Sequence, residues 1–195
     1  MRIYTKSGDE GETSLIYGRR IAKDDTRVDT YGTCDEANST IGLALALLPD
    51  NEGWHQVRLA GQRIQRDLFD VGRDLATPED KREGFYINEE DVKVLERLID
   101  TFDAQLPPLQ RFVLPGGHPA AAAFHQARTV TRRAERTVVA LARVQSVQPW
   151  IRKYLNRLSD LLFVLARLVN ARTGVAEPSV SFQEAKPNPF GEGGE

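Results

Sequence analysis

Apolar side chains recur every three to four residues over most of the chain after residue 32, which predicts a series of amphipathic α-helices. The first begins where Thr33-Cys34-Asp35-Glu36 fits a capping box, with Thr33 as N-cap, and runs to about Leu48. The other predicted helices span about 52–75, 88–102, 119–144 and 149–174. No alternation of apolar and polar residues is long enough to predict a strand. The expected fold is therefore all-α, an antiparallel five-helix bundle.

Both ends of the chain lack this periodicity. Residues 1–26 are polar and rich in Gly, Thr, Ser and charge, and we expect them to form an ordered arm. Residues 27–174 are expected to form the bundle, and the Pro-, Gly- and Glu-rich residues 175–195 a mobile tail. The 195 residues suit a single domain, because one hydrophobic core can still grow to this size.

Composition restricts the compartment and the classes of binding partner that we expect for this protein. The formal net charge is −2, so no global basic field exists to attract nucleic acid. No apolar run approaches the ~20 residues of a membrane span. The single cysteine, Cys34, cannot form an internal disulfide and indicates a reducing compartment. We therefore expect a cytoplasmic protein that binds neither nucleic acid nor membrane.

The arm carries residue types that suit a phosphate group. Residues 5–14 read TKSGDEGETS, and Lys23 follows. Glycines let backbone amides approach a polyanion, hydroxyls donate to phosphate oxygens, and Lys6 and Lys23 supply positive charge. The acidic residues among them favour a divalent cation beside the phosphates. The segment is not a Walker loop, and a flexible polar tail remains the alternative interpretation.

Three arginines share one side of the fourth predicted helix. Arg128, Arg132 and Arg136, here called the arginine column, are spaced by four residues, and Glu135 lies beside them. Like charges about 4 Å apart repel by roughly 4 kcal/mol at an effective dielectric constant near 20. The column therefore indicates a docked anion or an acidic residue from elsewhere, and a solvated basic face is equally compatible with it.

Two other features allow a binding role. Asn156 and Asp160 lie one turn apart on the last predicted helix and could hold an adenine edge, a ribose or an arginine, although an exposed polar face is the simpler interpretation. Phe112 precedes Pro115 in a stiffened loop, where it could be a hydrophobic wedge or a lid on the core.

Several chemistries lack support in the sequence. A di-iron bundle needs two Glu-x-x-His motifs on separate helices, and only residues 52–55 (EGWH) fit. No cluster of cysteine or histidine indicates zinc, and no serine, histidine and aspartate stand out as a triad.

Four segments together match one family. The sequence resembles the PduO-type ATP:corrinoid (cobalamin) adenosyltransferases over residues 3 to about 170. The resemblance rests, in order, on TKSGDEGETS (5–14) through Lys23, YGTCDEAN (31–38), RTVTRRAER (128–136) and YLNRLSD (154–160). Cys34 and Ala37 replace the more usual aliphatic residues, and the tail from Ser181 onward lacks a tryptophan that some members carry.

The resemblance implies a homotrimer with active sites between subunits. Asp35 would pair with Arg128 across the subunit boundary, and Phe112 would press on the lower face of the corrinoid. Catalysis would depend on these three residues and Arg132, and no metal ligand is assigned. The implied ATP-binding residues are Thr5, Lys6, Ser7, Gly8, Thr13, Ser14, Lys23, Arg132, Glu135, Arg136 and Asn156.

The implied reaction moves the 5′-deoxyadenosyl group of ATP to the Co(I) of a reduced corrinoid, forming adenosylcobalamin and releasing triphosphate. The resemblance also implies Mg²⁺ on the triphosphate, K⁺ as a further cation, and a corrinoid reductase and an adenosylcobalamin-dependent enzyme as partners. Two alternatives remain: a bundle that binds ATP and regulates or delivers a cofactor without catalysis, and a purely structural bundle.

Overall fold

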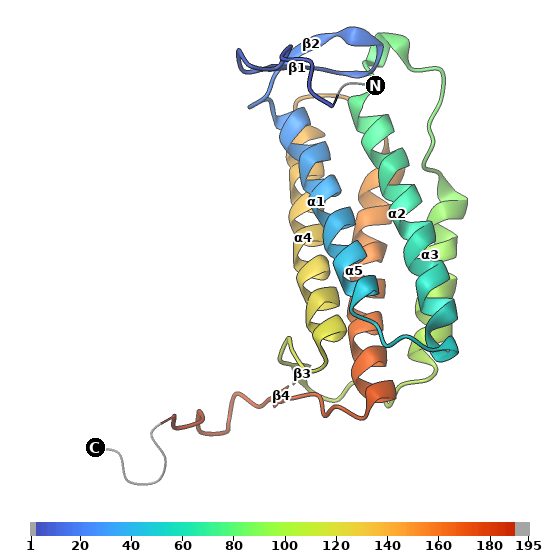
Figure 1. Cartoon of the computed structure of the whole chain (residues 1–195), viewed down its shortest axis with the longest axis vertical. Helices are drawn as coiled ribbons and strands as arrows, with labels where there is room; N and C mark the ends of the chain where they lie inside the picture. The colour runs from blue at the N-terminus through green and yellow to red at the C-terminus, as the bar shows by residue number, and fades with distance from the viewer. Residues whose placement is uncertain (1–2, 190–195) are drawn as a thin grey trace.

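The computed structural model describes residues 3–189, and in this range five α-helices form an antiparallel bundle (Figure 1). This confirms the predicted all-α fold. The first two residues of the expected arm and the last six of the expected tail lie outside the described residues. The helices are α1 (Thr26–Ala46), α2 (His55–Ala76), α3 (Glu89–Asp103), α4 (Pro119–Leu141) and α5 (Pro149–Thr173).

The predicted start of the first helix is wrong. α1 begins at Thr26, seven residues before Thr33, because the Asp25 carboxylate accepts a hydrogen bond from the backbone N–H of Arg27 and caps the helix there. Thr33 lies inside α1, and its hydroxyl donates to the carbonyl of Asp29. The first turns of α1 bury Arg27 and Thr30 rather than apolar side chains, so hydrophobic spacing does not reveal them.

The other helix starts follow the local sequence signals. Asn88 and Asp91 form a capping box at the start of α3. Pro119 and Pro149 occupy the first turns of α4 and α5, where a missing backbone N–H costs little. A short 3-10 helix, η2 (Glu52–Trp54), precedes α2. The α-helix therefore begins at His55, three residues after the predicted start at Glu52.

The core lies where the helices meet. α4 packs against α1 on one side and α5 on the other, α2 packs against α1, and α3 packs against α5. A buried polar group crosses this core: the Tyr154 hydroxyl donates to Asp67 at 3.0 Å, and Arg63 donates to the same carboxylate at 2.7 Å. Burial raises the pKa of Asp67, and its two donors act against that shift.

Two short antiparallel strand pairs, which the sequence did not predict, lie at opposite ends of the bundle (Figure 1). In the arm, β1 (Glu12–Ser14) pairs with β2 (Arg20–Ala22), around the 3-10 turn η1 (Ile16–Gly18). At the other end, β3 (Phe112–Val113) pairs with β4 (Ser179–Val180), which joins the start of the tail to the loop before α4. Among the described helices, none is long and apolar enough to cross a membrane.

Candidate active site

Arg20 organises the arm. Its guanidinium donates to the Ser7 carbonyl at 2.7 Å, to the Ser14 hydroxyl at 3.1 Å and to the Glu12 carboxylate at 3.3 Å. These bonds connect the loop at residues 5–8 to the hairpin, and the Thr5 and Ser7 hydroxyls lie 2.8 Å apart within it. The described part of the arm is therefore ordered, and Arg20 connects its loop to its hairpin.

Gly8 and Lys23 lie in direct contact. A Cβ atom at Gly8 would come within 3.1 Å of the Lys23 ammonium nitrogen, and the backbone N–H of Lys23 donates to the Gly11 carbonyl at 2.8 Å. Lys6 adopts a left-handed backbone conformation with φ 63°, which bends the chain beside them. Thr13 follows in β1, beside the hydroxyl of Tyr31, whose pKa is raised by burial and by Asp25. The fold thus brings Gly8 and Lys23 together, whereas Thr13 lies against Tyr31.

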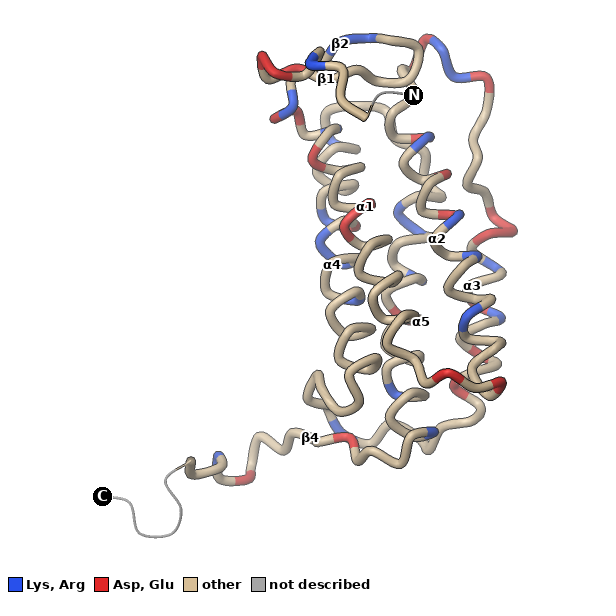
Figure 2. The backbone as a smooth tube through the Cα atoms, viewed as in Figure 1, with Lys and Arg blue, Asp and Glu red and all other residues tan. Residues whose placement is uncertain are grey.

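The second group of predicted residues forms a basic groove on α4. Figure 2 shows basic positions along the middle of this helix. Arg132, Glu135 and Arg136 line an open groove of about 460 Å³, and Arg143 extends it toward the arm end of the bundle. Three cationic side chains face one carboxylate there, so the groove has a positive balance that suits a polyanion.

Asn156 reaches this groove from α5. Its side-chain N–H donates to the Glu135 carboxylate at 3.1 Å, and its carbonyl accepts a longer bond of 3.5 Å from Arg157. Asp160 instead pairs with Arg157 at 3.3 Å. Arg133, the residue after Arg132, forms an ion pair with Glu36 on α1. The structure therefore brings together Arg132, Glu135, Arg136 and Asn156 and separates Arg133 from them.

Arg128 and Asp35 face different sides of the chain. The Arg128 guanidinium lies 6.0 Å from the centre of the Phe163 ring on α5, and its pKa is lowered by burial and by Arg132. Asp35 lines a groove of about 420 Å³ between α1 and α2, together with the exposed ring of Phe69. The predicted pair is therefore not formed within one chain.

Phe112 projects from β3, with 71% of its surface exposed. The Phe182 ring contacts it edge to face, with the ring centres 5.9 Å apart, and Arg111 pairs with Glu184 beside them. The tail thus adds an aromatic ring to the predicted wedge. The sequence reasoning did not assign a role to Phe182, and only a structure shows that β4 returns the tail to this loop.

The two ends of the site are far apart in a single chain. Phe112 lies near the start of α4, whereas the arm lies at the opposite end of the bundle (Figure 1). Pro119 and Arg132 are 13 residues apart, which is about 20 Å at the α-helical rise. The arginine column therefore lies between Phe112 at one end of the bundle and the arm at the other end.

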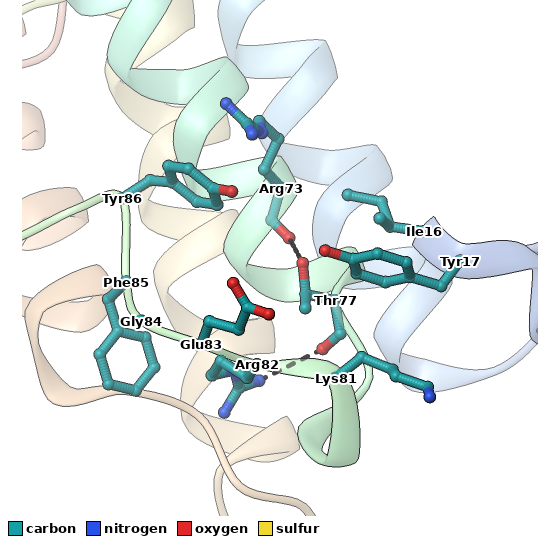
Figure 3. Close-up of a pocket in the computed structure, with 10 residues that line it drawn as sticks. All are labelled: Ile16, Tyr17, Arg73, Thr77, Lys81, Arg82, Glu83, Gly84, Phe85 and Tyr86. Carbon is teal, nitrogen blue, oxygen red and sulfur yellow. Dashed lines mark hydrogen bonds between the residues drawn. The ribbon is translucent and has the colours of Figure 1, made fainter.

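A smaller pocket of about 250 Å³ lies where the arm meets the loop after α2 (Figure 3). Tyr17 enters it in a left-handed conformation with φ 66°, opposite Thr77. Beside it, the Arg73 guanidinium stacks on the Tyr86 ring at 3.7 Å, and an ion pair of 2.7 Å joins Arg19 to Asp80. Tyr17 and the ion pair from Arg19 to Asp80 dock the arm on its own bundle.

Comparison with known proteins identifies the family of this chain. A family model described as cobalamin adenosyltransferase matches residues 3–169. The corrinoid adenosyltransferase of Bacillus subtilis (strain 168) is 48% identical over 177 residues, which cover 91% of each chain. The chain belongs to the cobalamin adenosyltransferase family. The predicted family and fold are both confirmed.

Other members of the cobalamin adenosyltransferase family agree. The corrinoid adenosyltransferase of Mycobacterium tuberculosis (strain ATCC 25618 / H37Rv) is 48% identical over 175 residues, covering 87% of this chain and 89% of the relative. Among solved structures, a variant PduO-type ATP:corrinoid adenosyltransferase from Lactobacillus reuteri complexed with cobalamin and ATP is 38% identical. It superimposes with a TM-score of 0.87, covering 93% of this chain and 97% of that one.

Proposed function

We propose that this protein transfers the 5′-deoxyadenosyl group of ATP to the cobalt of a reduced corrinoid. The observation that carries the proposal is the basic groove of Arg132, Glu135 and Arg136 with Asn156 bound to its carboxylate, in a chain of the cobalamin adenosyltransferase family. Co(I) attacks C5′ of ATP, the Co–C bond forms, and the C5′–O bond breaks. The bonding electron pair leaves with the triphosphate.

The leaving group determines what the protein must supply. Negative charge stays on the triphosphate, so fixed cations stabilise its departure without a general base. We assign this task to Lys6, Lys23, Arg132 and Arg136. The hydroxyls of Thr5, Ser7, Thr13 and Ser14 and the backbone at Gly8 would bind the phosphates beside them. Glu135, oriented by Asn156, accepts from the nucleoside.

Magnesium enters this account as part of the substrate. Within residues 3–189, no group of three or more His, Cys, Asp or Glu side chains could hold a metal ion. Magnesium commonly binds through substrate phosphates and water rather than an all-protein cage. We therefore assign Mg²⁺ to the triphosphate, and K⁺ to the same anionic group.

Phe112 serves the reduction that precedes transfer. We assign its ring to the lower face of the corrinoid, where an exposed aromatic side chain displaces the axial base and excludes water. A cobalt without that ligand accepts an electron more easily. The electron would come from a corrinoid reductase, and the adenosylated product would pass to an adenosylcobalamin-dependent enzyme.

The complete site requires more than one copy of the chain. We propose a homotrimer in which the arm of one copy covers the arginine column of the next, and Asp35 of one copy pairs with Arg128 of another. Three observations support this: the arm docks away from the groove in its own chain, Asp35 and Arg128 face different sides, and the C-terminal end of α1 exposes apolar side chains. Leu43 is 55% exposed, and Leu47, directly after α1, is 40% exposed.

A spectrum tests the reaction directly. Purified protein with cob(II)alamin, ATP and a reductant should form adenosylcobalamin and release one triphosphate for each molecule of adenosylcobalamin formed. Omitting ATP is the control. A protein that binds ATP yet changes neither the corrinoid spectrum nor the triphosphate concentration would be a regulatory bundle instead.

A further inference from the structure

His125 is a buried polar residue that the reaction described above does not use. It lies on α4 with only 2% of its surface exposed, and neither ring nitrogen has a hydrogen-bond partner within the described residues. A buried polar group without a partner costs roughly 1–3 kcal/mol. An apolar side chain of the same size would avoid that cost, so the imidazole is expected to have a partner in some functional state.

The position of His125 indicates which group that partner is. His125 precedes Arg128 by three residues and Arg132 by seven, so it lies on the same face of α4 as the arginine column. It occupies the end of the column nearest Pro119, the end where Phe112 lies. The His125 side chain therefore lies next to Arg128 along the column, at the end of the bundle assigned to the corrinoid.

Phe163 on α5 contacts both residues. The His125 ring meets it edge to face with the ring centres 6.0 Å apart, and the Arg128 guanidinium lies 6.0 Å from the same ring centre. The Nε atom of Arg128 is itself buried without an acceptor. Two polar groups that lack partners thus lie against one aromatic ring, a donor on Arg128 and a ring nitrogen of His125 that can accept.

The protonation state of His125 suits an acceptor. Burial, and then the neighbouring Arg128, lowers the pKa of His125 to about 4. The imidazole is therefore neutral at pH 7, with one nitrogen free to accept a hydrogen bond.

We propose that His125 is a positioning residue that accepts a hydrogen bond from Arg128 and fixes its guanidinium when Arg128 engages Asp35 and the corrinoid. The inference rests on the proposed function, because Arg128 needs to be held in position only if the corrinoid binds there. Phe163 acts as the surface along which the guanidinium reaches this position. The consequence is selective: corrinoid binding depends on His125, and ATP binding does not.

Equilibrium binding of cob(II)alamin in the presence of ATP, and of ATP alone, tests the proposal in the full-length protein. His125→Leu should weaken cob(II)alamin binding at least about tenfold, because hydrogen bonds to charged groups are among the stronger ones. It should change the ATP affinity less than about twofold. His125→Gln, which retains an acceptor, should recover most of the corrinoid affinity. Phe124→Leu, a buried change on the same helix, is the matched packing control.

A double-mutant cycle separates positioning from packing. In an Arg128→Ala background, His125→Leu should weaken corrinoid binding no further. Full additivity, or equal losses for ATP and corrinoid, would overturn the proposal. If His125→Leu does not fold, His125→Phe takes its place in the cycle, because this variant keeps a ring against Phe163. A wild-type protein that makes no adenosylcobalamin would instead defeat the proposed function, whatever the cycle shows.

Discussion

Asn156 on α5 donates a 3.1 Å hydrogen bond to Glu135 on α4, and this bond joins the two helices at the basic groove. It orients a carboxylate that lines the same groove as Arg132 and Arg136. The groove can therefore present both positive charge for phosphates and a fixed acceptor for the nucleoside.

The first prediction concerns this bond. Asn156→Ala leaves Glu135 without its donor and removes the contact to ATP that we propose for Asn156. We expect ATP to bind about 10 to 100 times more weakly, from the loss of one or two charge-assisted hydrogen bonds. Calorimetric titration with Mg-ATP checks this. Asp160→Ala, one turn along the same helix and paired with Arg157, is the control. Unchanged ATP affinity in the Asn156 variant would remove both residues from the site.

Arg20 gives a second prediction. Arg20→Ala removes three hydrogen bonds that connect Ser7, Ser14 and Glu12. The arm should lose its order, and the KM for ATP should rise about tenfold or more while the melting temperature of the bundle stays nearly constant. Arg19→Ala, which breaks only the exposed ion pair with Asp80, should have little effect on the KM. Equal effects of the two changes would contradict the role given to Arg20.

Phe112 gives a third prediction. Phe112→Ala should keep ATP affinity and lower the rate with cob(II)alamin at least about tenfold, because the lower axial ligand stays on cobalt and reduction becomes harder. Phe182→Ala should lower it less, since Phe182 supports the Phe112 ring rather than replacing it. With cob(I)alamin supplied already reduced, the loss should be smaller. The same loss with both corrinoids would contradict the wedge.

The pKa of His125 gives a fourth prediction, on stability. A buried neutral imidazole with a pKa of about 4 binds fewer protons than the unfolded chain, where the value is near 6.5. Its contribution to unfolding free energy is therefore present above about pH 6.5 and is lost as the pH falls toward 4. Wild-type protein should lose more stability than His125→Leu over this range, as measured by urea denaturation. Parallel curves for the two proteins would contradict the burial of a neutral ring.

The sequence predicted the fold well because hydrophobic spacing and caps are local signals. Asn88, Pro119 and Pro149 each mark a helix start that the structure confirms. The start of α1 was missed because its first turns bury Arg27 and Thr30 instead of an apolar face. Local signals cannot report a polar group that is buried by distant parts of the chain.

The site was only partly predictable for the same reason. Helix geometry places residues that are four apart on one face, so the sequence alone predicts that the arginines of the column share a face. The bond from Asn156 to Glu135, the role of Arg20 and the contact of Phe182 with Phe112 depend on elements far apart in the chain.

Mixed assemblies of two inactive variants test the central claim most directly. Lys6→Ala disables the arm and Arg132→Ala disables the column, and each variant alone should be nearly inactive. Co-expressed in equal amounts, they form trimers in which some sites pair an intact arm with an intact column from another copy. For random assembly, the account predicts recovery of about a quarter of wild-type adenosylcobalamin formation. No recovery in trimers shown to contain both variants would mean that arm and column act within one chain, and would contradict the account.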